Sequence, residues 1–151
     1  MLRVTLNESL KAAVKAKDQR ATSTLRLILA ALKDRDIAAR GKGNCDGIGE
    51  DEILVMLQQM VRQREEAIQL YDRGGRNDLV QKENEEIDLI QRFLPEQLHE
   101  HEMQGAIQDV IGELKAVSLK DMGRIMGKLK ERYPGRMDFG RASAIVKQKL
   151  S

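Results

Sequence analysis

Apolar residues recur every three or four positions over most of this chain, which is the spacing of amphipathic helices. Glycine and proline interrupt the pattern at few places, so their positions divide the chain into predicted elements. Three stretches contain neither residue: 1–40, 50–73 and 76–94. In the first stretch, Thr5 with Glu8 forms a capping box that predicts one helix start, and Asp18 is a suitable N-cap for a second helix. The predicted buried positions of these two helices are Leu6, Leu10, Ala13, Val14 and Ala16, then Leu25, Ile28, Leu29, Leu32 and Ile37.

The next two stretches predict a helical hairpin. A third helix begins near Glu50, where three successive acidic residues suit the positive end of the helix dipole, and it ends at Gly74–Gly75. A fourth helix is capped by Asn77 or Asp78 and closed by Pro95. Because only a short glycine turn separates the two helices, we expect them to pack side by side and antiparallel.

The predicted elements beyond Pro95 are shorter. One helix follows directly, and a second is capped by Ser118 with Asp121. The sequence Tyr133–Asp138 predicts a turn, after which Asp138 caps a last helix. The C-terminal part of the chain therefore predicts three short helices.

No stretch shows the alternation of a strand, so the predicted fold class is all-α. We expect an N-terminal domain of long helices with a helical hairpin, residues 1–95, and a small three-helix domain, residues 96–151. The chain has 151 residues, of which 41% are hydrophobic and 33% charged, and this size and composition suit a folded protein that needs no disulfide or metal to form its core.

Composition also bears on location. The single cysteine, Cys45, makes no internal disulfide, which fits a reducing compartment. The longest apolar run, Leu27–Leu32, is far shorter than the ~18 residues of a membrane helix, and the N-terminal residues contain no hydrophobic signal region. These features predict a cytoplasmic protein without a membrane partner.

Charge is unevenly distributed, although the formal net charge is only +2. Residues 96–114 hold five acidic and no basic side chains, whereas residues 115–151 hold ten Lys or Arg against three acidic residues. If residues 119–131 are helical, three cations stand one turn apart on one face, and we call them the basic ridge: Lys120, Arg124 and Lys128. Six further cations could extend the basic ridge, depending on how the last helix packs: Lys130, Arg132, Arg136, Arg141, Lys147 and Lys149.

A row of cations suits phosphate groups, because each contact releases counterions from a nucleic acid. The alternative is an ordinary solvated helix face. Gly123 and Gly127 lie beside the basic ridge, where each costs about 1 kcal/mol relative to alanine. Another helix backbone within the domain explains them better than a sugar-phosphate contact. Aromatic residues are only 3% of the chain, so a folded RNA recognised by shape is a better target than stacked single strands.

Two features suggest chemistry that their spacing does not support. His99 and His101 point apart on a helix and have no further Cys or His to complete a zinc site. The segment Gly41–Gly49 lacks the Lys-Ser/Thr ending of a P-loop and predicts a flexible connection with an exposed Cys45. We therefore expect no metal, no cofactor and no catalytic residue.

Two motifs together resemble a known family. The first runs through Gln63–Ile68 and Gly75–Leu79 to Phe93–Leu98, and the second joins Lys120–Gly127 to Gly135–Asp138. The whole chain resembles a stand-alone member of the GatB/YqeY family. This resemblance implies an all-helical protein, and it implies a relation to the tail of the B subunit of the glutamine-dependent aspartyl/glutamyl-tRNA amidotransferase, where the module serves tRNA recognition.

The resemblance also selects residues. The matching motif positions are Asp121, Gly123, Gly127, Gly135 and Asp138, and the RNA-binding candidates are Lys120, Arg124, Lys128, Arg136, Arg141 and Lys147. The leading hypothesis is a non-catalytic, tRNA-associated module. The alternatives are an accessory subunit of a glutamine-dependent amidotransferase, which is a carbon–nitrogen ligase, and a protein-interaction module whose helical hairpin docks a partner. The sequence leaves the cognate tRNA and the oligomeric state open.

Overall fold

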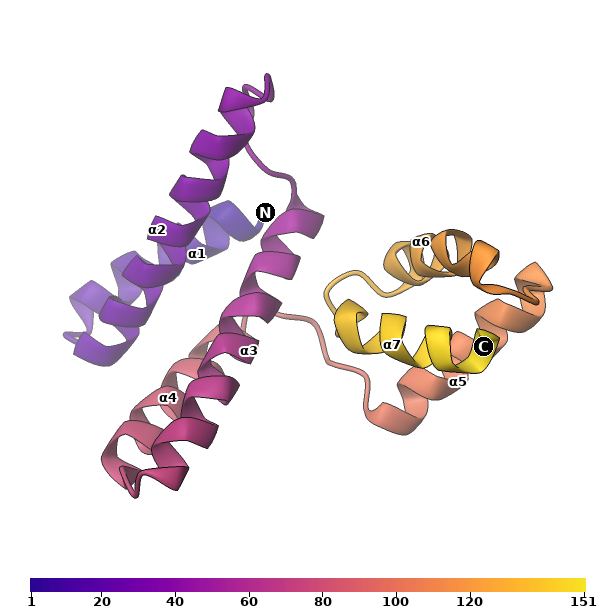
Figure 1. Ribbon diagram of the computed structural model, residues 1–151. Helices are drawn as coiled ribbons and strands as arrows, with labels where there is room; N and C mark the ends of the chain where they lie inside the picture. Colours follow the sequence, from indigo (N-terminus) through magenta and orange to yellow (C-terminus); the bar gives the residue numbers. More distant parts are fainter. The chain divides into compact units, whose positions relative to one another are not determined.

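A computed structural model describes all residues from Met1 to Ser151, and it is helical throughout (Figure 1). It contains seven α-helices, one short 3₁₀ turn and no strand, which confirms the predicted all-α class. The chain divides into two compact units, an N-terminal unit, Met1–Leu94, and a C-terminal unit, Pro95–Ser151. No helix combines the length and the apolar character that a membrane span requires.

Four long helices form the N-terminal unit. They are α1 (Leu2–Lys15), α2 (Gln19–Gly41), α3 (Glu50–Arg73) and α4 (Asn77–Gln91). Helices α1 and α2 pack as one antiparallel pair and α3 and α4 as another, while α2 also contacts α3 and α4 (Figure 1). The pair α3–α4 is the predicted helical hairpin, joined by a turn in which Gly75 adopts a φ of +70°.

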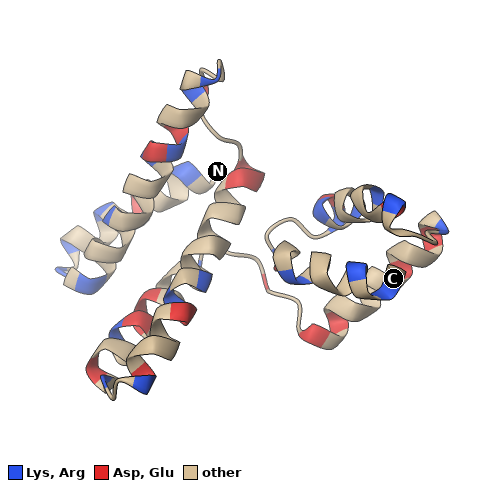
Figure 2. Cartoon of the chain, in the orientation of Figure 1, with Lys and Arg blue, Asp and Glu red and all other residues tan.

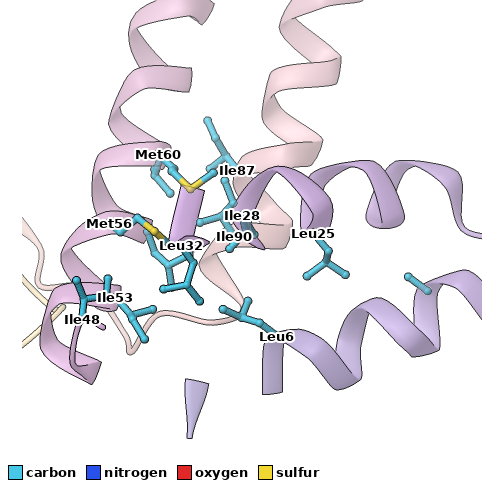
Figure 3. Packing of buried hydrophobic residues seen from close by; sticks show 13 residues of the cluster. Leu6, Leu25, Ile28, Leu32, Ile48, Ile53, Met56, Met60, Ile87 and Ile90 are labelled. Atoms are coloured by element: carbon cyan, nitrogen blue, oxygen red, sulfur yellow. The ribbon is translucent and has the colours of Figure 1, made fainter. Parts of the chain in front are cut away.

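The core of this unit collects side chains from all four helices (Figure 3). Its fully buried members are Leu6, Leu25, Ile28, Ile53, Met56, Leu57 and Ile90. Three predicted members are exposed: Val14 at 50%, Ile37 at 54%, and Ala16, which follows the last residue of α1. Val14 lies in the last turn of α1, at the edge of the core. Ile37 is displaced because the spacing from Ile28 through Leu32 places the preceding residue, Asp36, on the inward face.

The predicted caps of the first two helices had different outcomes. Asp18 caps α2 as predicted, and its carboxylate accepts a 3.1 Å hydrogen bond from the backbone N–H of Ala21. The predicted start of α1 at Thr5 is wrong, because the helix begins three residues earlier, at Leu2. The reason is long-range: the Glu50 carboxylate accepts hydrogen bonds from the backbone N–H of Leu2 at 2.7 Å and from the terminal ammonium of Met1 at 2.6 Å.

The predicted cap of α4 is also wrong. Arg76 takes the N-cap position, and the helix begins at Asn77 without a side-chain cap. Asp78 binds the Arg76 guanidinium instead, at 3.2 and 3.1 Å. A local charge pair therefore replaces the expected hydrogen bond to the helix backbone.

Three helices form the C-terminal unit, as predicted, although the first is as long as α4. They are α5 (Glu100–Leu114), α6 (Met122–Arg132) and α7 (Phe139–Leu150), and a 3₁₀ turn at Leu119–Asp121 precedes α6. Their apolar faces enclose a separate core, whose fully buried members include Ile107, Val110, Ile125, Leu129, Met137, Ala142 and Val146.

The segment before α5 is hydrogen bonded to the turn between α6 and α7. The backbone N–H of Leu98 donates to the carbonyl oxygen of Arg136 at 2.8 Å, and the Gln97 amide donates to that of Gly135 at 2.6 Å. Arg136 in turn donates through Nε to the carbonyl oxygen of Glu96 at 3.0 Å. Gly135 has a φ of +73°, a conformation that favours glycine. Residues of both motifs that carry the family resemblance therefore meet in this contact.

Candidate nucleic-acid interface

Basic side chains gather on one part of the C-terminal unit. Figure 2 shows Lys and Arg on α6 and α7, while Asp and Glu dominate α5. Acidic residues repel phosphate, so α5 disfavours contact with a nucleic acid. The electrostatics of this unit therefore direct a polyanion to α6 and α7.

The basic ridge is less regular than the sequence predicts. Lys120 lies in the 3₁₀ turn and not in an α-helix, so the expected continuous helix over residues 119–131 is wrong in its first turn. The predicted capping box of Ser118 with Asp121 is present at the start of this turn, and the Asp121 carboxylate accepts hydrogen bonds from the backbone N–H groups of Val117 at 3.1 Å and Ser118 at 3.4 Å. These hydrogen bonds, with that from Val117 the largest cause, hold the pKa of Asp121 below its usual value.

Arg124 and Lys128 share one face of α6, four residues apart, and both contact carboxylates. An oxygen of Asp121 lies 3.2 Å from Arg124, whose guanidinium also donates to the carbonyl oxygen of Leu114 at 3.1 Å. Lys128 lies 3.9 Å from a carboxylate oxygen of Glu131. The Arg124 side chain is nevertheless 59% exposed, so the guanidinium remains accessible to a ligand.

The two glycines beside the ridge face open space. A Cβ atom built on Gly123 or Gly127 meets no other atom within 4 Å. The expected explanation, a close helix backbone within the same domain, is therefore wrong. Both positions lie on an exposed surface of α6 that a rigid ligand backbone can approach without meeting a side chain.

Two further predicted RNA-binding residues, Arg136 and Arg141, also make contacts within their own unit. Arg136 donates to Glu96 and stacks over the Tyr133 ring, 5.9 Å from its centroid. Arg141 forms an ion pair with Glu100, which raises the pKa of the guanidinium. Both contacts link the segment around α5 to residues after α6.

Two residues selected by the sequence analysis remain, the cation Lys147 and the helix cap Asp138. Lys147 is exposed on α7 and has no ion-pair partner. Asp138 caps α7 as predicted, and its carboxylate accepts hydrogen bonds from the backbone N–H groups of Gly140 at 3.0 Å and Arg141 at 3.3 Å. In this structure Asp138 therefore stabilises the start of α7.

The histidine pair lies at the start of α5. His99 is the N-cap residue, and its backbone N–H donates to the Glu102 carboxylate at 3.1 Å. The rings of His99 and His101 are stacked with centroids 6.2 Å apart. No group of three or more His, Cys, Asp or Glu side chains is arranged to hold a metal ion.

A buried carboxylate in the N-terminal unit escaped the sequence analysis. Asp36 is only 7% exposed, and its oxygens accept hydrogen bonds from both terminal nitrogens of Arg3, at 2.5 and 2.7 Å, and from the backbone N–H of Ile48 at 2.9 Å. The Arg3 guanidinium, opposed by burial and assisted by Ile48, lowers the pKa of Asp36 to about 2. The signal in the sequence was the inward helical position of Asp36.

This ion pair corrects the expectation of a flexible connection at Gly41–Gly49. Arg3 also donates to the carbonyl oxygen of Ile48 at 2.7 Å, so the second half of the connection is anchored to α1 and α2. Gly47 has a φ of +82°, and a Cβ there would lie 2.3 Å from an Asp36 carboxylate oxygen. Cys45 is exposed, in agreement with the sequence analysis.

A family profile described as "Yqey-like protein" matches residues 3–150. The chain belongs to the YqeY-like family. The match spans both units, so the N-terminal helices and the C-terminal three-helix unit belong to one family architecture.

Curated relatives of this YqeY-like chain carry the name "Altered inheritance of mitochondria protein 41, mitochondrial". The relative from Lachancea thermotolerans is 30% identical over 122 residues, which are 77% of this chain and 63% of the relative. The relative from Eremothecium gossypii is 38% identical over 89 residues, which are 59% of this chain and 46% of the relative. A relative from Saccharomyces cerevisiae is 33% identical over 89 residues, which are again 59% of this chain and 46% of the relative. The chain thus spans about half the length of the curated relatives it matches.

The prediction of a cytoplasmic protein is wrong by this comparison, because these relatives are named as mitochondrial proteins. The prediction used the lone Cys45 and the shortness of the apolar runs. Both features are equally compatible with a protein inside an organelle. Composition therefore had no power to choose between the two locations.

Proposed function

We propose that this YqeY-like chain is a non-catalytic module that binds the folded body of a transfer RNA through its C-terminal unit. The contact surface is the exposed side of α6, with the cations Arg124 and Lys128 and the glycines Gly123 and Gly127. The observation that carries the proposal is the pair of open glycines beside exposed cations. Glycine inside a helix costs stability, and nothing within the unit packs against these two.

The physical argument is one of approach and charge. A glycine lets an RNA sugar-phosphate backbone come close to the helix backbone, where a side chain would hold it away. The neighbouring guanidinium of Arg124 presents donors that match phosphate geometry, and Lys128 adds a second positive charge. Lys120 at the preceding turn and Lys147 on α7 supply further positive charge on the same unit.

Two further points support RNA over other polyanions. The chain has no Trp and few other aromatic residues, so stacking on splayed bases contributes little. Recognition then depends on the shape and backbone of a folded RNA. The resemblance to the tail of the amidotransferase B subunit supports transfer RNA as that folded RNA.

The test is a binding titration of the chain against total tRNA over a range of salt concentrations, with duplex DNA of similar charge as the comparison. We expect tight, salt-dependent binding to tRNA and weaker binding to DNA. The double variant Arg124→Glu with Lys128→Glu should bind tRNA more weakly, and its salt slope should fall by about 2, roughly one per lost phosphate contact.

A matched control reverses two exposed cations of the N-terminal unit, Arg73→Glu with Lys82→Glu. It changes the net charge by the same amount, so any effect of total charge appears in both variants. The proposal requires a larger loss for the α6 variant. Equal affinity and slope in the α6 variant and the original chain would refute it.

A further inference from the structure

The N-terminal unit carries a surface depression that lies outside the proposed RNA contact. It is open to solvent and has a volume of about 610 Å³ at the turn between α1 and α2. Its lining residues are Val14, Lys17, Gln19, Thr22, Ser23, Arg26 and Leu27. From Gln19 to Leu27 it follows α2 for about 12 Å, the length of roughly two helical turns.

Two large apolar side chains form part of this surface. Val14, from the last turn of α1, is 50% exposed, and Leu27, from α2, is 49% exposed. Neither belongs to the buried core of the unit. Because they come from different helices and line the same depression, they give it an apolar floor that water covers in the isolated chain.

Two cations border the same surface without ion-pair partners. Lys17 and Arg26 make no salt bridge, whereas the nearby Arg20 is paired with Glu85. The carboxylate of Asp18 is next in sequence to Lys17, but it serves as the cap of α2. With the Asp18 charge counted, Lys17 and Arg26 still leave a net positive charge at the border of the depression.

The charge of the whole region agrees with this local picture. Residues 1–48 contain ten basic and five acidic side chains, and residues 49–94 contain six basic and eleven acidic side chains. Figure 2 shows Lys and Arg at the turn between α1 and α2. An acidic ligand is thus attracted to the end of the unit that holds the depression.

We propose that this depression docks an acidic amphipathic helix of a partner protein. Apolar residues of that helix would cover Val14 and Leu27, and carboxylates on its flanks would pair with Lys17 and Arg26. A nucleic acid would satisfy the cations but leave the apolar floor against phosphate and water. An uncharged apolar helix would cover the floor but desolvate two cations without a counter-charge. Only a ligand with both properties matches the surface.

The first experiment titrates the full, ¹⁵N-labelled chain with a synthetic helical peptide that presents leucines one turn apart, flanked by glutamates. We expect amide signals around Val14, Ser23 and Leu27 to shift. A peptide with lysines in place of the glutamates, and another with serines in place of the leucines, should each bind about tenfold more weakly. No shift at these residues, or equal binding of the lysine peptide, would overturn the proposal.

Two variants and two controls locate the contact. Leu27→Ser removes the apolar floor and Arg26→Glu reverses a bordering charge, and each should weaken binding of the acidic peptide about tenfold. The controls are on the same helix but outside the depression: Ile37→Ser, at a similarly exposed apolar residue, and Lys33→Glu. Equal losses in the controls would contradict the assignment, and circular dichroism of each variant verifies that it is folded.

A competition experiment separates this surface from the RNA contact. If total tRNA shifts the amides of Val14 and Leu27 and displaces the peptide, the depression belongs to an RNA surface and the proposal fails. If tRNA leaves these signals unchanged while the peptide still binds, the partner-helix proposal holds. The α6 variant described above should bind the peptide as the original chain does.

Discussion

The Nε atom of Arg136 donates a hydrogen bond of 3.0 Å to the carbonyl oxygen of Glu96, 40 residues earlier in the chain. The same guanidinium lies over the ring of Tyr133. Arg136, which the sequence analysis names as an RNA-binding candidate, thus helps to join the segment before α5 to the turn between α6 and α7. We therefore expect a substitution of Arg136 to lower the stability of the C-terminal unit.

Arg136→Ala should lower the free energy of unfolding by about 1–2 kcal/mol, because it removes a charged donor from a backbone carbonyl group. Urea unfolding followed by circular dichroism measures the change. Lys147→Ala is the control, since this cation is exposed and has no ion-pair partner, and its change should stay within about 0.5 kcal/mol. Equal losses in both variants would show that the Glu96 contact adds nothing.

Asp36→Asn should destabilise the N-terminal unit by about 2 kcal/mol at neutral pH. Arg3 lowers the pKa of Asp36 to about 2 in the folded chain, so the ionised carboxylate is more stable there than in the unfolded chain. This contribution is fully present above the unfolded pKa near 4 and is lost as the pH falls from there towards 2.

The difference between the original chain and Asp36→Asn should therefore shrink over that acidic range. Urea unfolding at several pH values, from neutral down to about pH 2, measures it. A difference that stays constant with pH would mean that the Asp36 charge does not stabilise the folded state.

Gly47→Ala should destabilise the chain by roughly 2 kcal/mol or more. An alanine there meets two costs, a left-handed backbone and a Cβ that displaces the Asp36 carboxylate from Arg3. Gly41→Ala is the matched control, because Gly41 ends α2 and its Cβ would face open space. Thermal melts of both variants test this, and a neutral Gly47→Ala would refute the anchored connection.

Gly127→Ala should stabilise the isolated chain by up to about 1 kcal/mol, because alanine is the better helix former and nothing blocks its Cβ. If RNA approaches this side of α6, the same variant should bind tRNA more weakly. Gly105→Ala on α5 is the control, since its Cβ also meets open space. It should gain similar stability without loss of tRNA affinity, and identical RNA binding by both variants would count against the α6 contact.

The helices were predictable because their information is local. Asp18 and Asp138 each cap a helix a few residues away, and the glycines at residues 74 and 75 mark a turn that no long-range contact alters. The hairpin of α3 and α4 follows from the same local pattern. Apolar spacing and breakers are sufficient for such elements.

The misplaced features depend on contacts between distant residues or on turn chemistry. Asp36 has the appearance of a surface residue, and its burial is made favourable by the guanidinium of Arg3, 33 residues away, and by the backbone N–H of Ile48. The start of α1 depends in the same way on Glu50. Lys120 lies in a 3₁₀ turn ahead of α6, and apolar spacing does not distinguish such a turn from the first turn of an α-helix. The RNA contact and the peptide contact are proposals that the sequence pattern alone does not decide.

The hydrogen bonds from Gln97 to Gly135 and from Leu98 to Arg136 join the segment before α5 to the turn before α7. Residues of α5 and α6 are thereby enclosed in a closed loop, whose closure entropy is shared by all of its contacts. Amide hydrogens in α5 and α6 should therefore exchange with solvent together, as one cooperative block.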